Sequence, residues 1–209
     1  MCVEAIGFRD FLLNLSKMKA IPRSGWLSHD VSLQDVESVA DHTFSTSVLS
    51  MLIADLEVER GVRVNTEKVL RMALLHDLAE SLTFDISRAY LDYMGTKGER
   101  MKREIERTAW GHLVKEVEDR QLARRYAGAQ REYVEDKTAE AKIVHAADSM
   151  DILLQVVSYL RRGYPEALLS DLWKERISMV RESGVPSAHA MLKRIINENR
   201  ELARSRRLK

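Results

Sequence analysis

The stretch Met72-Ala-Leu-Leu-His76-Asp77-Leu-Ala-Glu80 places ionisable side chains inside a run that is otherwise apolar enough to form a buried helix. Unpaired buried charge is costly, so these groups must be hydrogen-bonded, ion-paired or bound to a metal. In a helix Glu80 shares one edge with His76 and Asp77, because residues three and four positions apart are neighbours. The stretch therefore predicts a polar site within a helical core, either a satisfied core pair or a ligand site.

The rest of the composition also favours helices. The 209 residues include only three prolines and nine glycines, and alternating β-branched residues are nearly absent. We therefore predict an all-α fold. The length suits one sizeable core, and no repeat or flexible linker divides the chain, so we expect a single domain over residues 1–209.

Charge and cysteine content exclude several classes of function. The formal net charge is +1, which predicts neither a nucleic-acid partner nor an anionic membrane surface. We expect no membrane-spanning run and no signal peptide, and hence a cytoplasmic protein. Cys2 is the only cysteine, so an intrachain disulfide and a cysteine zinc site are both excluded.

Three segments precede the ionisable stretch. We expect a helix over Ala5–Lys17, an irregular loop over Met18–Asp35 because of Pro22 and Gly25, and a long, mostly buried helix from Ser38 towards Gly61. The apolar residues expected to face inward from these two helices include Phe11, Leu12, Leu15, Val39, Phe44, Val48, Leu52 and Ile53.

Further polar residues interrupt helical, mostly apolar stretches elsewhere in the chain. His42 lies in the second predicted helix, and Asp148 follows two alanines far downstream. With His76 and Asp77 they give two imidazoles and two carboxylates, a set that can bind one divalent transition metal and leave positions for water and substrate. Manganese, cobalt, nickel, iron and zinc all suit such a mixed nitrogen and oxygen site.

Alternatives remain open around this set. Either Glu37 or Asp41 can hold the second ring nitrogen of His42. His112 is a weaker candidate for a second metal site, because a single histidine near the exposed face of a charged helix is usually only a surface residue.

The ordered motifs resemble the HD-domain metal-dependent phosphohydrolases, and within them the YfbR-like 5′-deoxynucleotidase family, which includes the eukaryotic HD-domain-containing protein 2. The resemblance covers about residues 5–165, with the C-terminal helices 166–209 expected to pack on this core. It is carried by Arg23-Ser-Gly-Trp26, Glu37-Ser-Val-Ala-Asp-His42, His76-Asp-Leu-Ala-Glu80, Asp85, Glu132-Tyr133, and Ala139-Glu-Ala-Lys-Ile-Val with Asp148.

The resemblance implies roles for individual residues. It implies a helical bundle with a metal site in its core, held by His42, His76, Asp77 and Asp148; Asp151 is the alternative if the register differs. Arg23 is expected near the phosphate and Trp26 near the sugar or base. Ser24-Gly25 separates these two residues, which are adjacent in bacterial members, so the role of Trp26 transfers less directly.

Two acidic residues complete the expected site. By resemblance Glu80 lies beside the attacking water and Asp85 reaches the sugar hydroxyls.

The resemblance also implies the reaction, which is hydrolysis of 2′-deoxyribonucleoside 5′-monophosphates. The protein is expected to form a homodimer. Other HD phosphohydrolases, acting on nucleoside triphosphates or cyclic nucleotides, and a non-catalytic helical module stabilised by a metal are the alternatives.

Overall fold

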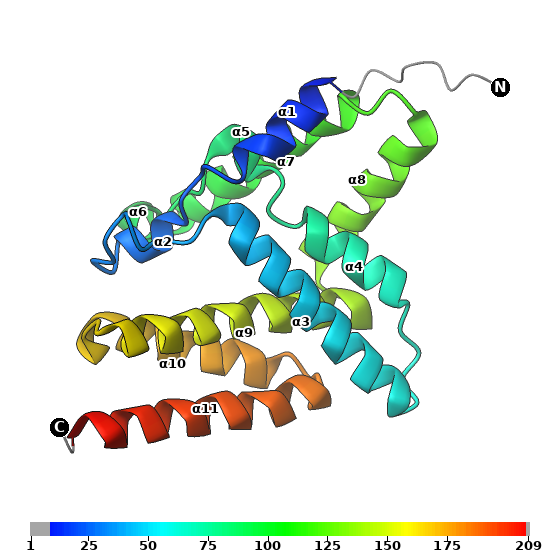
Figure 1. The fold of residues 1–209 in the computed structure, drawn as a ribbon. Helices are drawn as coiled ribbons and strands as arrows, with labels where there is room; N and C mark the ends of the chain where they lie inside the picture. Colours follow the sequence, from blue (N-terminus) through cyan, green and yellow to red (C-terminus); the bar gives the residue numbers. More distant parts are fainter. Residues whose placement is uncertain (1–8, 208–209) are drawn as a thin grey trace. The chain divides into compact units, whose positions relative to one another are not determined.

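The computed structural model describes residues 9–207, except for the side chains of residues 89 and 205–207. Helices make up most of this range, as Figure 1 shows, and the described residues contain no strand beyond an isolated antiparallel bridge between Pro22 and Ser38. The all-α prediction is confirmed. The helices are α1 (Arg9–Lys17), α2 (Ser24–Leu27), α3 (Val39–Glu59), α4 (Thr66–Leu75), α5 (Glu80–Thr83), α6 (Arg88–Met94), α7 (Thr96–Lys115), α8 (Arg120–Glu135), α9 (Ala139–Arg162), α10 (Glu166–Glu182) and α11 (Pro186–Arg207).

The described chain divides into two compact units. The first runs up to Thr43 and from Leu74 to Arg131, and the second comprises Phe44–Ala73 and the chain from Glu132 onwards. The single domain over residues 1–209 stays a prediction.

In the first unit, α5 packs against both α1 and α7, and α6 packs against α7. Its hydrophobic core consists of Met18, Ile21, Val39, Leu78, Ala79, Ala109, Trp110 and Leu113.

Helix α1 differs from the sequence expectation. Its described part begins at Arg9, and the expected start at Ala5 lies outside the described residues. Leu12 and Leu15 were expected to face inward but are exposed, Leu12 by 58%. Asn14 is buried instead, and its side-chain amide donates to the Glu116 carboxylate at 3.0 Å. The polar contact with Glu116 therefore sets which face of this short helix is covered.

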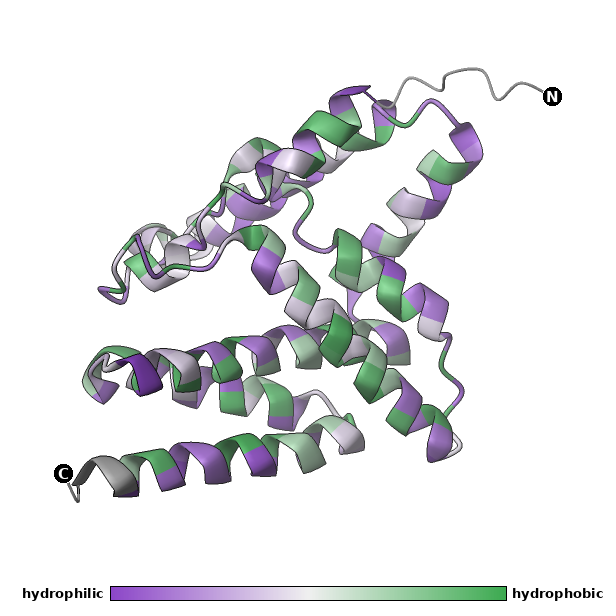
Figure 2. Ribbon diagram, viewed as in Figure 1, coloured by the Kyte–Doolittle hydropathy of each residue, from purple (hydrophilic) through white to green (hydrophobic). Residues whose placement is uncertain are grey.

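Helix α9 is the central helix of the second unit and packs against α10 and α11. Thr138 caps its start by accepting a hydrogen bond from the Ala141 N–H at 3.2 Å, and Gly163 ends it in the left-handed conformation. Figure 1 shows α9, α10 and α11 side by side, and Figure 2 shows hydrophobic and hydrophilic residues alternating around α10 and α11. Amphipathic helices of this kind bury one face against a central apolar helix.

Sequence inspection missed one property of α9. By length and composition alone this helix is apolar enough to cross a bilayer, although 72% of its most apolar window is buried inside the protein. A buried core helix passes the same test, so the finding is only weak evidence for a membrane span.

Helix α3 was expected to be mostly buried, and this expectation was wrong for much of its apolar surface. Phe44 is 70% exposed, and Val48 and Leu52 are also exposed. The covered face instead carries His42 and small hydroxyl residues, among them Thr46 and Ser50. Apolar residues occur on every side of this helix, so periodicity could not identify its buried face.

Candidate metal centre

Three donor atoms meet in the first unit. His42 Nε2 lies 3.3 Å from His76 Nε2, and Asp77 Oδ2 lies 3.2 Å from His76 Nε2 and 3.6 Å from His42 Nε2. Both histidines are buried. Metal–ligand bonds of about 2.0–2.2 Å place neighbouring donor atoms roughly 3 Å apart, so these donors fit a single divalent cation.

The backbone around His76 and Asp77 is not the continuous helix that the sequence predicted. Helix α4 ends at Leu75, and His76 and Asp77 lie in the turn that leads to α5, whereas a continuous helix was predicted. The Glu80 N–H donates to the Asp77 carbonyl at 2.9 Å, which preserves a tight helix-like turn. The turn keeps the polar residues near one another while ending the α4 hydrogen-bond ladder.

His42 is fixed by the start of α3. The Ser38 N–H donates to Asp41 Oδ2 at 2.9 Å, and the Asp41 N–H donates to Ser38 Oγ at 3.1 Å. These reciprocal bonds form a capping box immediately before His42. The exposed Asp41 carboxylate thus serves the helix start, whereas a Glu37 carboxylate oxygen lies within 4.8 Å of a His42 ring nitrogen. Of the two acids left open by the sequence, the geometry favours Glu37 as the neighbour of this ring.

Arg23 reaches the same donors from the loop before α2. Its Nη1 donates to Asp77 Oδ2 at 2.8 Å, and its backbone N–H donates to the Glu37 carbonyl at 3.0 Å. The structure therefore joins Arg23 to the predicted ligand Asp77, although 54 positions separate them in the chain. A guanidinium held here can neutralise negative charge that a ligand brings to the centre.

Electrostatics reinforce this arrangement. Burial alone would raise the pKa of the Asp77 carboxyl, but His76, Arg23 and His42 outweigh it and hold that pKa well below its usual range. Asp77 is therefore ionised, which is the state in which a carboxylate binds a metal.

Glu80 has the opposite character. Burial raises its pKa well above the usual value, and the Asp77 and Asp85 carboxylates add to this rise. One of its oxygens, Oε2, is buried and has no hydrogen-bond partner among the described residues. A raised pKa makes the ionised form of this carboxyl a stronger base than an ordinary glutamate, which suits it to proton transfer.

Asp85 and Trp26 line the neighbouring loops, but in different ways. Asp85 Oδ2 accepts a hydrogen bond from the Ser24 N–H at 2.6 Å, which ties the segment after α5 to the residue following Arg23. Trp26, on α2 within the predicted irregular loop, is only 3% exposed, and its indole N–H donates to Glu37 at 2.8 Å. The indole ring therefore anchors the loop.

Helix α7 adds two charged residues that sequence reasoning did not select. Lys102 pairs with Glu106 at 3.6 Å, and its charge acts on Glu80. Burial raises the pKa of Glu106, and the negative charge of Asp77 raises it further. The ion pair with Lys102 acts in the opposite direction and lowers this pKa. Their four-residue spacing is common on solvated helices, so nothing in the sequence marked this pair.

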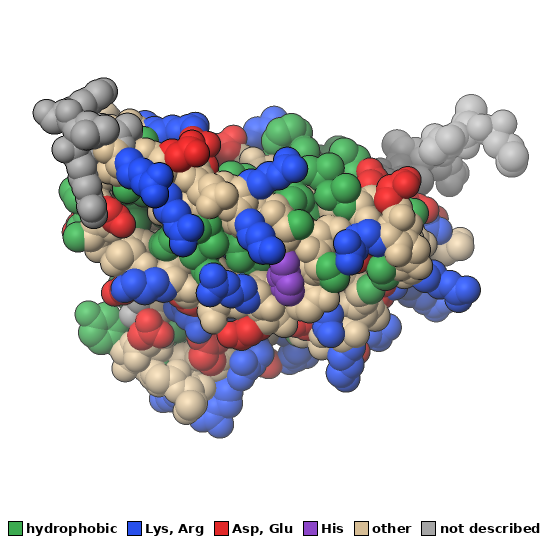
Figure 3. All heavy atoms as spheres, turned by 90° about the horizontal axis from the view of Figure 1, so that it is seen from below, with side chains coloured by type: hydrophobic (Ala, Val, Ile, Leu, Met, Phe, Trp, Pro, Cys, Tyr) green, Lys and Arg blue, Asp and Glu red, His purple; other side chains and the backbone are tan. Residues whose placement is uncertain are grey.

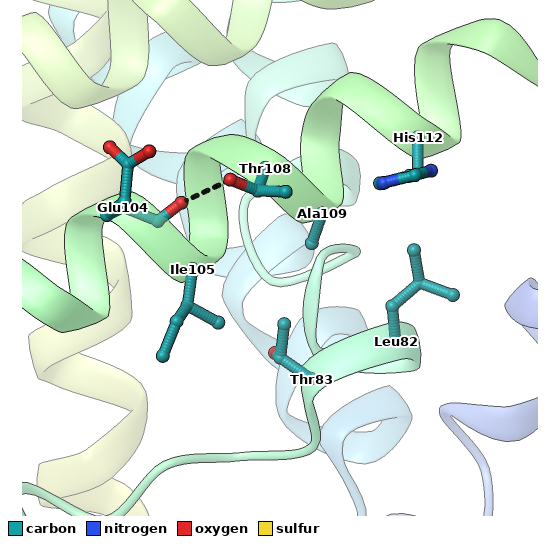
Figure 4. Close-up of a pocket in the computed structure, with 7 residues that line it drawn as sticks. All are labelled: Leu82, Thr83, Glu104, Ile105, Thr108, Ala109 and His112. Atoms are coloured by element: carbon teal, nitrogen blue, oxygen red, sulfur yellow. Dashed lines mark hydrogen bonds between the residues drawn. The ribbon is translucent and has the colours of Figure 1, made fainter.

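Three further candidates are Asp148, Asp151 and His112. Asp148 is half-buried and Asp151 buried on α9 of the second unit, and their metal binding stays a prediction. His112 is exposed on α7 and borders a hollow of about 320 Å³, whose acidic side chain, Glu104, is already paired with Arg107. Figure 4 shows this hollow, lined by Leu82, Thr83, Glu104, Ile105, Thr108, Ala109 and His112.

The helical fold and the paired imidazoles beside an aspartate define an HD-type protein. The HD-domain family model matches residues 15–185, so the chain belongs to the HD-domain family. Among its relatives is the 5′-deoxynucleotidase HDDC2 of Xenopus laevis, 32% identical over 149 residues, which cover 71% of this chain and 67% of the relative. The Homo sapiens protein of the same name is 31% identical over 163 residues, covering 78% and 73%.

Solved structures of other proteins have a similar fold. The PH0347 protein from Pyrococcus horikoshii OT3 has a TM-score of 0.77 and 28% identity, covering 90% of this chain and 98% of its own. An HD-domain phosphohydrolase from Listeria innocua has a TM-score of 0.73 at 20% identity, with coverages of 93% and 89%, and this likeness concerns the fold alone. The predicted family is confirmed.

Proposed function

We propose that this protein is a metal-dependent 5′-deoxynucleotidase, which hydrolyses 2′-deoxyribonucleoside 5′-monophosphates to deoxynucleoside and phosphate. The observation that carries the proposal is the meeting of His42, His76 and Asp77 with the Arg23 guanidinium. The names of the relatives from Xenopus laevis and Homo sapiens support the choice of substrate.

The reaction breaks the bond between phosphorus and the 5′ oxygen and forms a bond from phosphorus to a water oxygen. A divalent cation bound by His42, His76 and Asp77 would lower the pKa of water and polarise a phosphoryl oxygen. Arg23 binds phosphate oxygens and offsets the negative charge that develops on them.

Glu80 and Asp85 complete the mechanism. Glu80 takes a proton from the attacking water through Oε2, which has no hydrogen-bond partner among the described residues, and its raised pKa makes it a stronger base. Glu80 then gives this proton to the leaving 5′ oxygen, so the deoxynucleoside departs as an alcohol and the carboxylate is restored. Asp85, placed by its bond to the Ser24 N–H, accepts a hydrogen bond from a sugar hydroxyl.

The test is phosphate release from deoxy- and ribonucleoside 5′-monophosphates, 3′-monophosphates, triphosphates and cyclic nucleotides. Each is assayed with manganese, cobalt, nickel, iron or zinc, which also identifies the supporting metal. Release confined to deoxynucleoside 5′-monophosphates supports the proposal. Activity on triphosphates or cyclic nucleotides contradicts the proposed substrate, and no release with any metal contradicts the proposed catalysis.

Asp148 is proposed as the fourth ligand. Its support is the family resemblance and its place as a half-buried carboxylate on an otherwise largely apolar helix. Asp148→Asn should reduce the metal content of the purified protein, whereas Asp151→Asn should leave it unchanged. The reverse result would assign the ligand to Asp151.

A homodimer is proposed as the assembly. In support, α3 exposes Phe44, Val48, Met51 and Leu52 at helical spacing, and no Asp, Glu, Lys or Arg occurs between Asp41 and Asp55. Large exposed apolar surfaces of this kind mark interaction sites. Light scattering at micromolar concentration should give the mass of two chains, and the mass of one chain would contradict the proposal.

No nucleic-acid or membrane partner is proposed. The formal net charge is +1, and Figure 3 shows one face on which Lys and Arg side chains are interspersed with acidic, apolar and uncharged ones. Nucleic-acid binding usually requires basic residues gathered in one patch or stripe. A small-molecule nucleotide is therefore the proposed ligand.

A further inference from the structure

Phe84 combines an unfavourable backbone with an exposed aromatic ring. Its φ of 59° and ψ of 168° lie in a region that is populated almost only by glycine. Its side chain is 66% exposed, so the ring gains little from packing against the rest of the protein. The other described non-glycine residues with positive φ are Asp30 and Asp136, and aspartate tolerates positive φ far better than phenylalanine.

Contacts on both sides hold Phe84 in this conformation. Its N–H donates to the Glu80 carbonyl at 2.8 Å, and Thr83 Oγ1 donates to its carbonyl at 3.0 Å. The following residue, Asp85, accepts the hydrogen bond from the Ser24 N–H. Backbone strain that persists because the surroundings fix it is typical of functional sites.

The order of groups along a nucleotide gives this strained residue a role. Arg23 is assigned to the phosphate and Asp85, next to Phe84, to the sugar, so the base extends beyond the sugar and away from the buried metal donors. A base can stack only on an aromatic face that it can reach. Trp26 is 3% exposed and has its N–H bonded to Glu37, whereas the ring of Phe84 is accessible.

We propose that Phe84 is the base-stacking residue of this site and that its strained backbone presents the ring to the nucleobase. The inference rests on the proposed nucleotidase function. Stacking uses the π-face that every base possesses, so Phe84 binds purine and pyrimidine deoxynucleotides alike.

The experiment compares a substrate that has a base with one that lacks it. KM and kcat are measured for 2′-deoxyadenosine 5′-monophosphate and for 2-deoxyribose 5-phosphate, with wild type, Phe84→Ala and Phe84→Gly. Tyr93→Ala is the matched control, because Tyr93 on α6 is an aromatic residue with 91% exposure. Phe84→Tyr keeps a stacking ring.

We expect both Phe84→Ala and Phe84→Gly to raise KM for the deoxynucleotide about tenfold, as loss of one stacked base does. KM for the sugar phosphate should stay unchanged, as should both KM values in Tyr93→Ala and Phe84→Tyr. Phe84→Gly should melt at a higher temperature than Phe84→Ala, because glycine alone relieves the strain.

Equal changes in KM for the two substrates, or no change for either, would overturn the assignment while leaving the nucleotidase function standing. Phe84→Ala melting above Phe84→Gly would overturn the strain argument. If wild type releases phosphate from neither substrate, the proposed function itself has failed, and this result is distinct from a failure confined to the variants.

Discussion

At the scale of single residues, the centre contains two acids whose pKa values shift in opposite directions. One carboxylate is held in its ionised form, and the other takes up a proton more readily than usual. Asp77 lies between two imidazoles and a guanidinium, which lower its pKa, whereas Glu80 is buried near other carboxylates, which raise its pKa. Environments that separate the pKa values of neighbouring acids assign them different tasks. This contrast supports the proposed roles of Asp77 as a metal ligand and of Glu80 as the proton acceptor.

Asp77→Asn tests the ligand role. The amide has no charge to hold a cation, so we expect metal content to fall to near zero and turnover to fall by at least about 100-fold. Metal analysis of the purified protein and phosphate release measure the two effects. Asp92→Asn, at an exposed position on α6, is the control. Full metal content in Asp77→Asn would remove Asp77 from the ligand set.

Glu80→Gln tests the proton acceptor. The amide keeps the size of the side chain but cannot take a proton, so turnover should fall by about 10²–10⁴ while the bound metal is retained. The same two measurements apply. A variant purified without metal would show that Glu80 is a ligand instead.

At the scale of elements, the capping box at the start of α3 fixes the residue that precedes His42. Ser38→Ala removes the side-chain half of this box and should lower the free energy of unfolding by about 1 kcal/mol. Urea denaturation measures the change. Ser45→Ala, on the same helix but outside the cap, should have a smaller effect; equal losses would mean that the box does not stabilise the helix.

Three residues of the second unit, each on a different helix, form a cluster of ion pairs. Lys68 of α4 lies 2.5 Å from Glu132 of α8 and 3.6 Å from Glu140 of α9. Burial tends to raise the pKa of Glu132, but hydrogen bonds from Lys68 and Thr138 and the Lys68 charge lower it below 4.5. A lowered folded-state pKa stabilises the protein above the unfolded value, and this stability is lost as pH falls through the folded pKa.

Lys68→Met should therefore lower the melting temperature at pH 7 by about 1–3 °C. The difference from wild type should shrink as pH falls below about 4.5, since Glu132 then becomes protonated in both proteins. Thermal unfolding monitored by circular dichroism from pH 7 to pH 3 measures this trend. A difference independent of pH would attribute the loss to packing of the lysine stem.

Sequence alone predicted the helical fold and the chemical type of the donors, because few prolines and glycines favour helices and because charge in an apolar run needs a partner. It did not predict that His76 and Asp77 would lie in a turn, since a turn of this kind keeps a helix-like spacing. It placed Val39 and Ile53 of α3 inside correctly. It was wrong for five other apolar residues of α1 and α3, which are exposed: Leu12, Leu15, Phe44, Val48 and Leu52. An amphipathic pattern identifies the buried face of a helix only where polar residues are confined to the opposite side of that helix.

At the scale of the whole molecule, the exposed apolar residues of α3 bear on assembly. Phe44→Glu introduces a charge where the proposed homodimer buries an aromatic ring, so the variant should be monomeric at micromolar concentration with unchanged circular dichroism. Light scattering measures the mass. Tyr93→Glu, an exposed aromatic position on α6, should remain dimeric, and a dimeric Phe44→Glu would place the interface elsewhere.

The bridge between Pro22 and Ser38 determines where this part of the chain can accept inserted residues. Hydrogen bonds from the Arg23 N–H to Glu37 and from the Val39 N–H to Ile21 clamp both ends of the segment between them. The segment is thus a closed Ω-type loop, whose exposed tip at residues 32–34 can change in length while the ends of the loop stay fixed. Because lengthening a loop adds little closure entropy, this tip is a permissive point for inserted residues, while Arg23 and His42 keep their positions.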